Sequence, residues 1–389
     1  MRVDEAWLSA ASDAEEGAAL TGSLIAHPSY PGAEAAVQEE IASWLRAAGL
    51  QPDLQEAAPG RPNVVARVVN GLGPTLLLNG HVDTVLAVNG WSSDPWQPWR
   101  DGDRLYGLGA CDMKAGVAAA MLAIRALASQ PDRWRGTVIF TSVVDEEAYS
   151  LGARALLASN IEADACIVME SSWERPCLGS VGKVLCGVDV TGKAAHASWP
   201  ATGINAAVEA SRFVSRLDAL PVGTHSRLTA TRCVLSLHSG SAQYVITVPE
   251  RARVLINRMI VPGETAASVR DELEELVADI GSSARFAVTV EPPYYPPWET
   301  PVDHPLVELF ADAYARETGQ APVWGYTGFG DANLFSGEAG IPTIQFGPHG
   351  AAFHQADEWV DVPSIGGAVR VLLQTALAFL QEREGAHST

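Results

Sequence analysis

The chain has 389 residues, of which 47% are hydrophobic, with a mean hydropathy of +0.07 and a formal net charge of −20. This length and apolar content exclude a disordered chain and favour two or three folded domains. The acidic excess argues against a nucleic-acid partner, because phosphate binding needs a surplus of basic side chains. We also expect no membrane partner and no signal peptide, since no apolar stretch reaches spanning length and residues 1–5 lack the basic and then apolar pattern.

The five cysteines include no Cys-x-x-Cys pair. An odd number of cysteines without such spacing is typical of reduced thiols. We therefore expect a cytoplasmic protein, without a disulfide framework and without a thiolate zinc site.

Helix and strand patterns alternate in the first part of the chain. Helices are predicted at 14–26, 34–48 and about 116–129, and strands at 63–69, 75–79, 137–144 and 165–169. This alternation predicts an α/β fold with a mixed, mostly parallel sheet that has helices on both faces.

The pattern changes after Glu170. A strand at 178–190, a helix at 204–217 capped by Gly203, a strand at 253–260, a helix at 264–280 and a strand at 286–290 indicate a ferredoxin-like β-α-β-β-α-β unit. Pro292-Pro293 and Pro296-Pro297 predict a stiff return linker, after which a helix (304–317), a strand (343–346) and a last helix (363–381) resume the α/β pattern. We therefore predict one α/β domain, residues 1–178 and 293–389, interrupted by an α+β lid at 179–292.

Candidate metal ligands lie directly after the predicted strands. His81 and Asp83 follow strand 75–79, Glu146 and Glu147 follow strand 137–144, and Glu170 follows strand 165–169. Ligand sites in open α/β sheets form at the carboxyl ends of strands. A histidine there binds a metal while a nearby carboxylate orients it. Taken singly, each motif also fits a loop-capping histidine or a solvated acidic turn.

Two further residues complete a ligand set. Asp112 lies in a glycine-rich turn at 107–116. We do not interpret this turn as a dinucleotide-binding loop, because Asp112 stands at the sixth motif position, where that motif has glycine, and because the turn does not follow a strand at the position that the motif requires. His354 follows strand 343–346. Two histidines and three carboxylates suit two divalent ions bridged by one carboxylate. Nitrogen and oxygen ligands favour two Zn²⁺, with Co²⁺ or Mn²⁺ as substitutes.

These motifs resemble the dizinc peptidase and deacylase family that includes acetylornithine deacetylase, succinyl-diaminopimelate desuccinylase, carboxypeptidase G and aminoacylase. The segments that carry the resemblance are His81-Val82-Asp83, the turn 109–116, Glu146-Glu147, Glu170, His354 and the lid segment 192–206. The resemblance implies that His81 and Glu170 bind one zinc ion, that Glu147 and His354 bind the other, and that Asp112 bridges both.

The resemblance also implies roles for four residues outside the ligand set. Asp83 would orient His81, and Glu146 would be the general base that deprotonates the bridging water and then protonates the leaving amine. His196, on the lid, would stabilise the oxyanion in a partner's active site, which implies a homodimer and a dimerisation role for the lid. Arg258 would bind a substrate carboxylate. An ordinary turn histidine and an exposed strand arginine are the alternatives for the last two.

The sequence departs from the family pattern in three places. Residues 246–249, Ile-Thr-Val-Pro, lack the asparagine that contacts substrate in many members, and Leu108 stands where arginine is common. Gly330 stands where the family has a threonine, directly before Asp331. The alternative for Asp331 is that it caps the short helix that follows it. These differences concern substrate recognition and leave the predicted metal ligands intact.

The implied function is a zinc amidohydrolase that cleaves an N-acyl amino acid or a related small amide with a metal-bridged hydroxide. A metallo-carboxypeptidase or dipeptidase with a dipeptide-like substrate is the alternative enzyme. A catalytically silent binding protein is a third interpretation, which the loss of Glu146 or of a metal ligand would favour, and none of these residues is lost.

Overall fold

The computed structural model describes residues 4–381. Residues 1–3, on which the expectation of no signal peptide partly rests, lie outside the described residues. The chain divides into two compact units, the first comprising residues 1–179, 300–325 and 330–389 and the second residues 180–299 and 326–329. The boundaries of the lid predicted from the sequence lie between residues 178 and 179 and between residues 292 and 293.

The first unit is built around a mixed sheet with the strand order β1-β2-β6-β3-β7-β15-β8. Their bounds are β1 Asp53–Ala58, β2 Arg61–Asn70, β3 Thr75–His81, β6 Gly136–Val143, β7 Ala165–Val168, β8 Cys177–Ser180 and β15 Thr343–Gln345. The central strands β6, β3, β7 and β15 are parallel, and β1, β2 and β8 join antiparallel at the sides. The predicted mixed α/β fold is confirmed.

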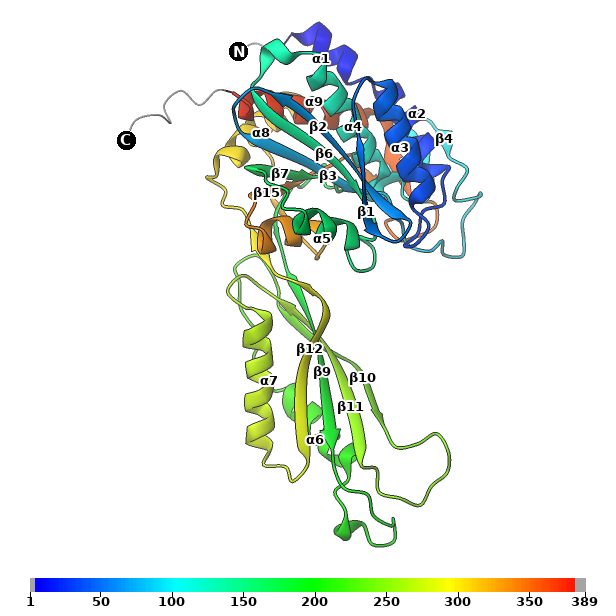
Figure 1. The fold of residues 1–389 in the computed structure, drawn as a ribbon, viewed down its shortest axis with the longest axis vertical. Helices are drawn as coiled ribbons and strands as arrows, with labels where there is room; N and C mark the ends of the chain where they lie inside the picture. The colour runs from blue at the N-terminus through cyan, green and yellow to red at the C-terminus, as the bar shows by residue number, and fades with distance from the viewer. Residues whose placement is uncertain (1–3, 382–389) are drawn as a thin grey trace, which may run out of the picture. The chain divides into compact units, whose positions relative to one another are not determined.

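Helices cover this sheet (Figure 1). Their bounds are α1 Glu5–Ala11, α2 Ala14–Ile25, α3 Ala35–Ala47, α4 Ala115–Ala128, α5 Leu151–Ala158, α8 Pro305–Thr318 and α9 Val362–Phe379. The alanine-rich α4 is almost completely buried, because it packs on β3 and β6 and is covered by α2 and α9. Contrary to the expectation, α9 is long and apolar enough to cross a membrane, but 83% of it is buried in the fold, as in the core helix of a soluble protein.

A second, small sheet joins two distant segments of the first unit. Its order is β16-β17-β5-β4, with β4 at Trp99–Asp101, β5 at Arg104–Tyr106, β16 at Gly350–Ala351 and β17 at Trp359–Asp361. Strands of two or three residues carry too little alternation to be predicted. The shorter elements of the chain are the turns η1 Ala110–Lys114, η2 Pro131–Arg133, η3 Pro200–Thr202 and η4 Asn333–Glu338, with β13 at Trp298–Glu299 and β14 at Gly325–Thr327.

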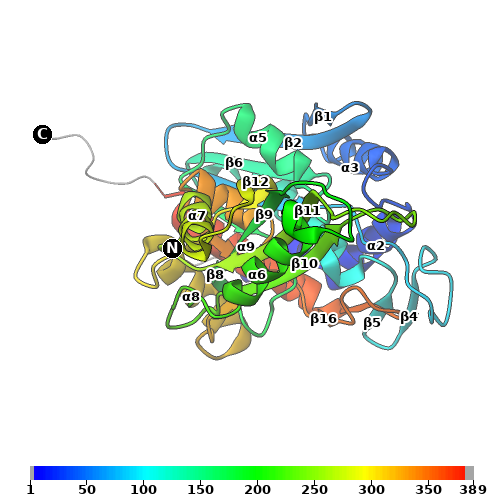
Figure 2. The same cartoon turned by 90° about the horizontal axis from the view of Figure 1, so that it is seen from below.

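The second unit is an antiparallel four-stranded sheet with the order β10-β11-β9-β12. Its strands are β9 Gly182–Thr191, β10 Thr231–Ser239, β11 Arg251–Ile260 and β12 Arg285–Tyr295, and its helices are α6 Ala206–Leu217 and α7 Ala266–Ile280. Both helices pack on the sheet and against each other (Figure 1 and Figure 2). The chain order β9-α6-β10-β11-α7-β12 confirms the predicted ferredoxin-like succession.

Several local predictions in this part of the chain were wrong. The single strand 178–190 is two strands, β8 and β9, separated at Val181. Helix α6 begins two residues late and is capped by Asn205 rather than Gly203, because the Asn205 side chain accepts hydrogen bonds from two backbone N–H groups. Pro292-Pro293 lie inside β12 instead of in a linker. β10 was not predicted, and its half-exposed, polar-rich sequence explains why.

Candidate metal centre

Four parallel strands bring the candidate ligands to one edge of the central sheet. β3 ends at His81, Glu146 and Glu147 follow β6, and Glu170 follows β7, while His354 lies beyond β15, between β16 and β17. This is the edge at which ligand sites form in α/β sheets. The sheet therefore gathers residues that are far apart in the sequence.

Asp112 reaches the same edge from the turn η1, directly before α4. The approach of α4 to β7 depends on Gly116, because a Cβ atom there would lie 2.0 Å from the carbonyl oxygen of Met169. This close packing holds the start of α4 beside the residue that precedes Glu170.

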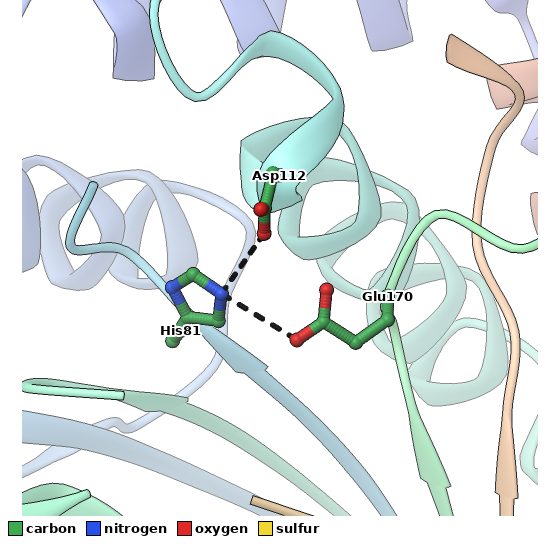
Figure 3. A group of neighbouring side chains, drawn as sticks. All are labelled: His81, Asp112 and Glu170. Atoms are coloured by element: carbon green, nitrogen blue, oxygen red, sulfur yellow. Dashed lines mark ion pairs between the residues drawn. The ribbon is translucent and has the colours of Figure 1, made fainter. Parts of the chain in front are cut away.

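His81, Asp112 and Glu170 form the first candidate ligand group (Figure 3). The His81 Nε2 atom lies 3.3 Å from Asp112 Oδ1 and 3.5 Å from Glu170 Oε1. Among the described residues, Nε2 is buried without a hydrogen-bond partner. A buried imidazole nitrogen that faces two carboxylates in this way fits a cation held between the three side chains.

Asp112, Glu147 and His354 form the second group, and the three ligand atoms of each group lie within 4.8 Å of one another. The His354 Nε2 atom lies 3.2 Å from Asp112 Oδ2 and 3.1 Å from Glu147 Oε1. Asp112 thus directs one carboxylate oxygen to each group. A carboxylate placed between two cation positions is the arrangement that a dinuclear site requires.

The ionisation of this cluster is strongly perturbed. Burial raises the pKa of Glu146 well above its usual range and that of Glu147 to about 7, and neighbouring carboxylates add to both shifts. Contact with Asp112 raises the pKa of His354 to about 9. Burial opposes ionisation of Asp112, but contacts with His354 and His81 lower its pKa overall. Crowded carboxylates of this kind fit divalent cations, which would relieve their mutual repulsion.

Asp83 contacts two parts of the site. Its carboxylate accepts hydrogen bonds from the backbone N–H groups of Glu146, at 3.1 Å, and of Glu147, at 2.9 Å. The nearer partner of His81 Nδ1 is the Asp83 carbonyl oxygen, at 3.0 Å, whereas the carboxylate lies at 3.6 Å. Asp83 therefore connects His81 to the turn that carries Glu146 and Glu147.

Arg61 neutralises part of the acidic turn formed by residues 145–147. The sequence did not predict this role. Its Nη2 atom contacts both Glu34 and Asp145, and its Nε donates to Glu34 at 3.0 Å. Glu34 and Asp145 are both buried. Asp145 is thus paired inside the fold, which leaves Glu146 and Glu147 for the site.

Residues 330 and 331 lie beside Glu146. Asp331 is buried and faces Asn79 at the end of β3, with 3.5 Å between Asn79 Nδ2 and Asp331 Oδ2. The suggestion that Asp331 caps the next helical turn was wrong, since η4 follows Ala332 and has no side-chain cap. A Cβ atom at Gly330 would lie 2.5 Å from Glu146 Oε1, so glycine in place of the family's threonine leaves room for the Glu146 carboxylate.

His196 and Arg258 belong to the second unit. His196 is exposed, and its Nδ1 accepts a hydrogen bond from Ser198 N at 3.1 Å. Arg258 is 1% exposed, its Nη1 donates to the Met259 carbonyl oxygen, and its Nη2 donates to Glu264. A substrate carboxylate would have to displace Glu264 to bind this guanidinium, and the predicted substrate role of Arg258 stays a prediction.

Sequence comparison identifies relatives along most of the chain. The family model described as Peptidase family M20/M25/M40 matches residues 77–378. An acetylornithine deacetylase of Vibrio campbellii is 37% identical over 194 residues, which cover 49% of this chain and 50% of that protein. A succinyl-diaminopimelate desuccinylase of Beijerinckia indica is 28% identical over 366 residues, which cover 89% of this chain and 94% of that protein.

Solved structures share the fold. Aminopeptidase PepT from Bacillus cereus superposes with a TM-score of 0.77 at 21% identity, covering 94% of this chain and 99% of that chain. The YXEP protein of Bacillus subtilis, described as a dinuclear metal-binding peptidase of the M20 family, superposes with a TM-score of 0.73 at 18% identity, covering 97% and 99%. Because the two structures are only 21% and 18% identical to this chain in sequence, their similarity shows a shared fold.

Proposed function

Because this chain belongs to peptidase family M20/M25/M40 and is therefore a hydrolytic enzyme, we propose that it is a zinc-dependent amidohydrolase of N-acyl amino acids or related small amides. The observation that carries this proposal is the pair of three-residue ligand groups that share Asp112. The relatives named as a deacetylase and a desuccinylase support the substrate class.

His81, Asp112 and Glu170 would hold one ion, and Asp112, Glu147 and His354 the other. When bound, the ions supply a Lewis acid for the amide carbonyl and lower the pKa of water. Nitrogen and oxygen ligands without sulfur favour Zn²⁺, with Co²⁺ or Mn²⁺ as substitutes.

Glu146 belongs to neither ligand group and is available for proton transfer. We assign it the role of general base, which takes a proton from the attacking water and delivers it to the leaving nitrogen. Asp83 holds the backbone N–H of Glu146, and the missing side chain at Gly330 gives its carboxylate space. These contacts keep Glu146 beside the ligands without making it one of them.

The proposal includes a homodimer in which His196 contributes to the partner's active site as an oxyanion donor. Strand β10 ends the sheet of the second unit, and within the described residues it pairs only with β11. Leu235 and Leu237 on this edge are 54% and 38% exposed. An open sheet edge with exposed apolar side chains is a ready surface for pairing with a second copy.

We further propose that the enzyme works in the cytoplasm. All five cysteines are free and four of them are buried, which is compatible with a reducing compartment.

Product analysis tests the proposed reaction. Zinc-loaded full-length protein is incubated with N-acetyl and N-succinyl amino acids and with dipeptides, and the products are identified by mass spectrometry, with metal-stripped protein as the control. We expect a small carboxylic acid and a free amino acid. Two amino acids released from a dipeptide would instead indicate a peptidase, and no hydrolysis of any amide by the zinc-loaded protein would contradict the proposal.

A further inference from the structure

Glu358 is a buried carboxylate to which the proposed reaction gives no role. It is 1% exposed and lies four residues after His354, directly before β17. A buried carboxylate is costly unless hydrogen-bond donors satisfy its oxygens. The donors that contact Glu358 therefore indicate what it does.

Three backbone N–H groups of the loop that carries Asp112 donate to this carboxylate. Glu358 Oε2 accepts a hydrogen bond from Gly109 N at 2.9 Å, and Oε1 accepts from Cys111 N at 2.9 Å and from Asp112 N at 3.0 Å. The Glu358 carbonyl oxygen accepts a further bond from Gly107 N at 3.0 Å. Four backbone N–H groups between residues 107 and 112 thus bind Glu358, and these contacts fix the backbone of the loop.

The small sheet explains why Glu358 reaches this loop. β17 pairs with β5, with Trp359 opposite Tyr106, so the residue before β17 lies beside the residues after β5. Gly109 permits the loop shape, because its φ is +80° and a Cβ atom there would lie 2.6 Å from Thr84 Cγ2. Glycine is suited to this left-handed position.

Contacts at other residues also constrain the backbone of the segment from His354 to Glu358. His354 and Asp357 have positive φ angles of 56° and 58°, which non-glycine residues rarely adopt. The Asp357 carboxylate accepts hydrogen bonds from Ser92 N at 2.8 Å and from Ser92 Oγ at 2.7 Å. Contacts of this kind maintain an unfavourable backbone conformation next to a functional side chain.

We propose that Glu358 is a positioning residue that fixes the backbone of the bridging ligand Asp112 relative to His354. Its carboxylate binds the Asp112 loop, and its own chain leads in four residues to His354. It thereby sets the separation of two ligands in the group formed by Asp112, Glu147 and His354. This inference rests on the proposed dinuclear site.

The variant Glu358→Gln tests the role with little change in size. An amide has one acceptor oxygen, so its NH2 group would face a backbone N–H donor that the wild-type carboxylate satisfies. Metal-stripped full-length protein is titrated with Zn²⁺ in competition with a chromogenic chelator. We expect the wild type to bind two ions and the variant to bind one of them about 10- to 100-fold more weakly, as for other residues that orient ligands.

Asp361→Asn is the matched control, since Asp361 lies three residues after Glu358, at the end of β17, but caps α9 through Ser364 N. This variant should keep the cap, because asparagine also accepts from backbone N–H groups, and leave both zinc affinities unchanged. A folded Glu358→Gln protein that binds both ions with wild-type affinity would overturn the proposal. A wild type that fails to bind two ions would instead contradict the proposed function.

Hydrogen exchange of the wild-type apoprotein gives a test that does not depend on the folding of a variant. The amides of Cys111 and Asp112 should be protected before metal is added, because Glu358 already holds them. Rapid exchange in the peptide covering 107–114 would refute the positioning role. Glu358→Asp, which keeps the charge but shortens the side chain, should weaken zinc binding in the same sense.

Discussion

Asp83 uses two different groups to hold two parts of the site. Its carbonyl oxygen contacts His81 Nδ1, and its carboxylate binds the backbone N–H groups of Glu146 and Glu147. A carboxylate two residues after a histidine was expected to act on the histidine itself. In the structure the carbonyl oxygen is the nearer partner of His81 Nδ1, at 3.0 Å against 3.6 Å for the carboxylate, and the role of Asp83 in orienting His81 stays a prediction.

Asp83→Asn is predicted to lower zinc affinity by about 10- to 100-fold, because asparagine keeps one acceptor oxygen and leaves one turn N–H unsatisfied. Competitive zinc titration measures the change. Asp53→Asn, at an exposed position on β1, is the control and should have no effect. Wild-type zinc affinity in Asp83→Asn would show that the turn does not need this carboxylate.

Glu146→Ala is predicted to reduce kcat by roughly 100- to 10,000-fold, the usual contribution of a general base. Both zinc ions should remain bound, because Glu146 lies outside the two ligand groups. Turnover and metal content are measured on the same sample, with Glu338→Ala on η4 as the control. Full activity in the Glu146 variant would eliminate its assigned role.

Zinc affinity is predicted to increase with pH. The pKa of Glu147 is raised to about 7, chiefly by burial, and that of His354 to about 9, chiefly by Asp112, so at neutral pH the metal-free protein holds a proton on His354 and a fraction of one on Glu147. Zinc must displace these protons to bind, which costs free energy. At higher pH the ligands are already deprotonated, so this cost disappears and zinc binds more tightly. Titrations across this pH range should show progressively tighter binding. A constant affinity would mean that the ligands are already deprotonated.

At the scale of elements, the buried parallel strands were predictable and the contacts between their loops were not. The buried parallel strands have continuous apolar runs, and His81, Glu147 and Glu170 lie at or shortly after their ends. By contrast, Arg61 lies 27 residues from Glu34 and 84 from Asp145, and Glu358 lies 246 residues from Asp112. No local pattern predicts such pairs, because only the folded sheets bring them together. The same reason explains why Arg61 and Glu358 could not be identified from the sequence.

Arg61→Met is predicted to lower the free energy of unfolding by about 3–5 kcal/mol, since it leaves the buried carboxylates of Glu34 and Asp145 without their cation. Chemical denaturation measures this change. Arg46→Met is the matched control, because its partner Glu39 is exposed and a surface pair contributes about 0–1 kcal/mol. Equal effects of the two substitutions would refute a special role for the Arg61 cluster.

At the scale of the whole molecule, the proposed homodimer makes a prediction about shared active sites. Glu146→Ala and His196→Ala homodimers should each be inactive or weakly active. When the two proteins are mixed and allowed to exchange subunits, one site of each mixed dimer has an intact Glu146 and receives an intact His196 from its partner. Activity should therefore reappear on mixing.

Co-purification of differently tagged subunits from the same mixture provides the control for subunit exchange. If mixed dimers form and activity does not return, His196 does not act across the interface. If the wild type sediments as a fully active monomer, the homodimer itself is excluded.

In the proposed enzyme, two metal ions bind at the carboxyl edge of the parallel sheet and are required for hydrolysis. The most direct measurement is a zinc titration of metal-stripped, full-length protein in which bound zinc and hydrolysis of an N-acyl amino acid are followed together. The proposed site predicts two zinc ions per chain, no activity without metal, and recovery of activity as the ions bind. Undiminished hydrolysis by the metal-free protein would contradict this account.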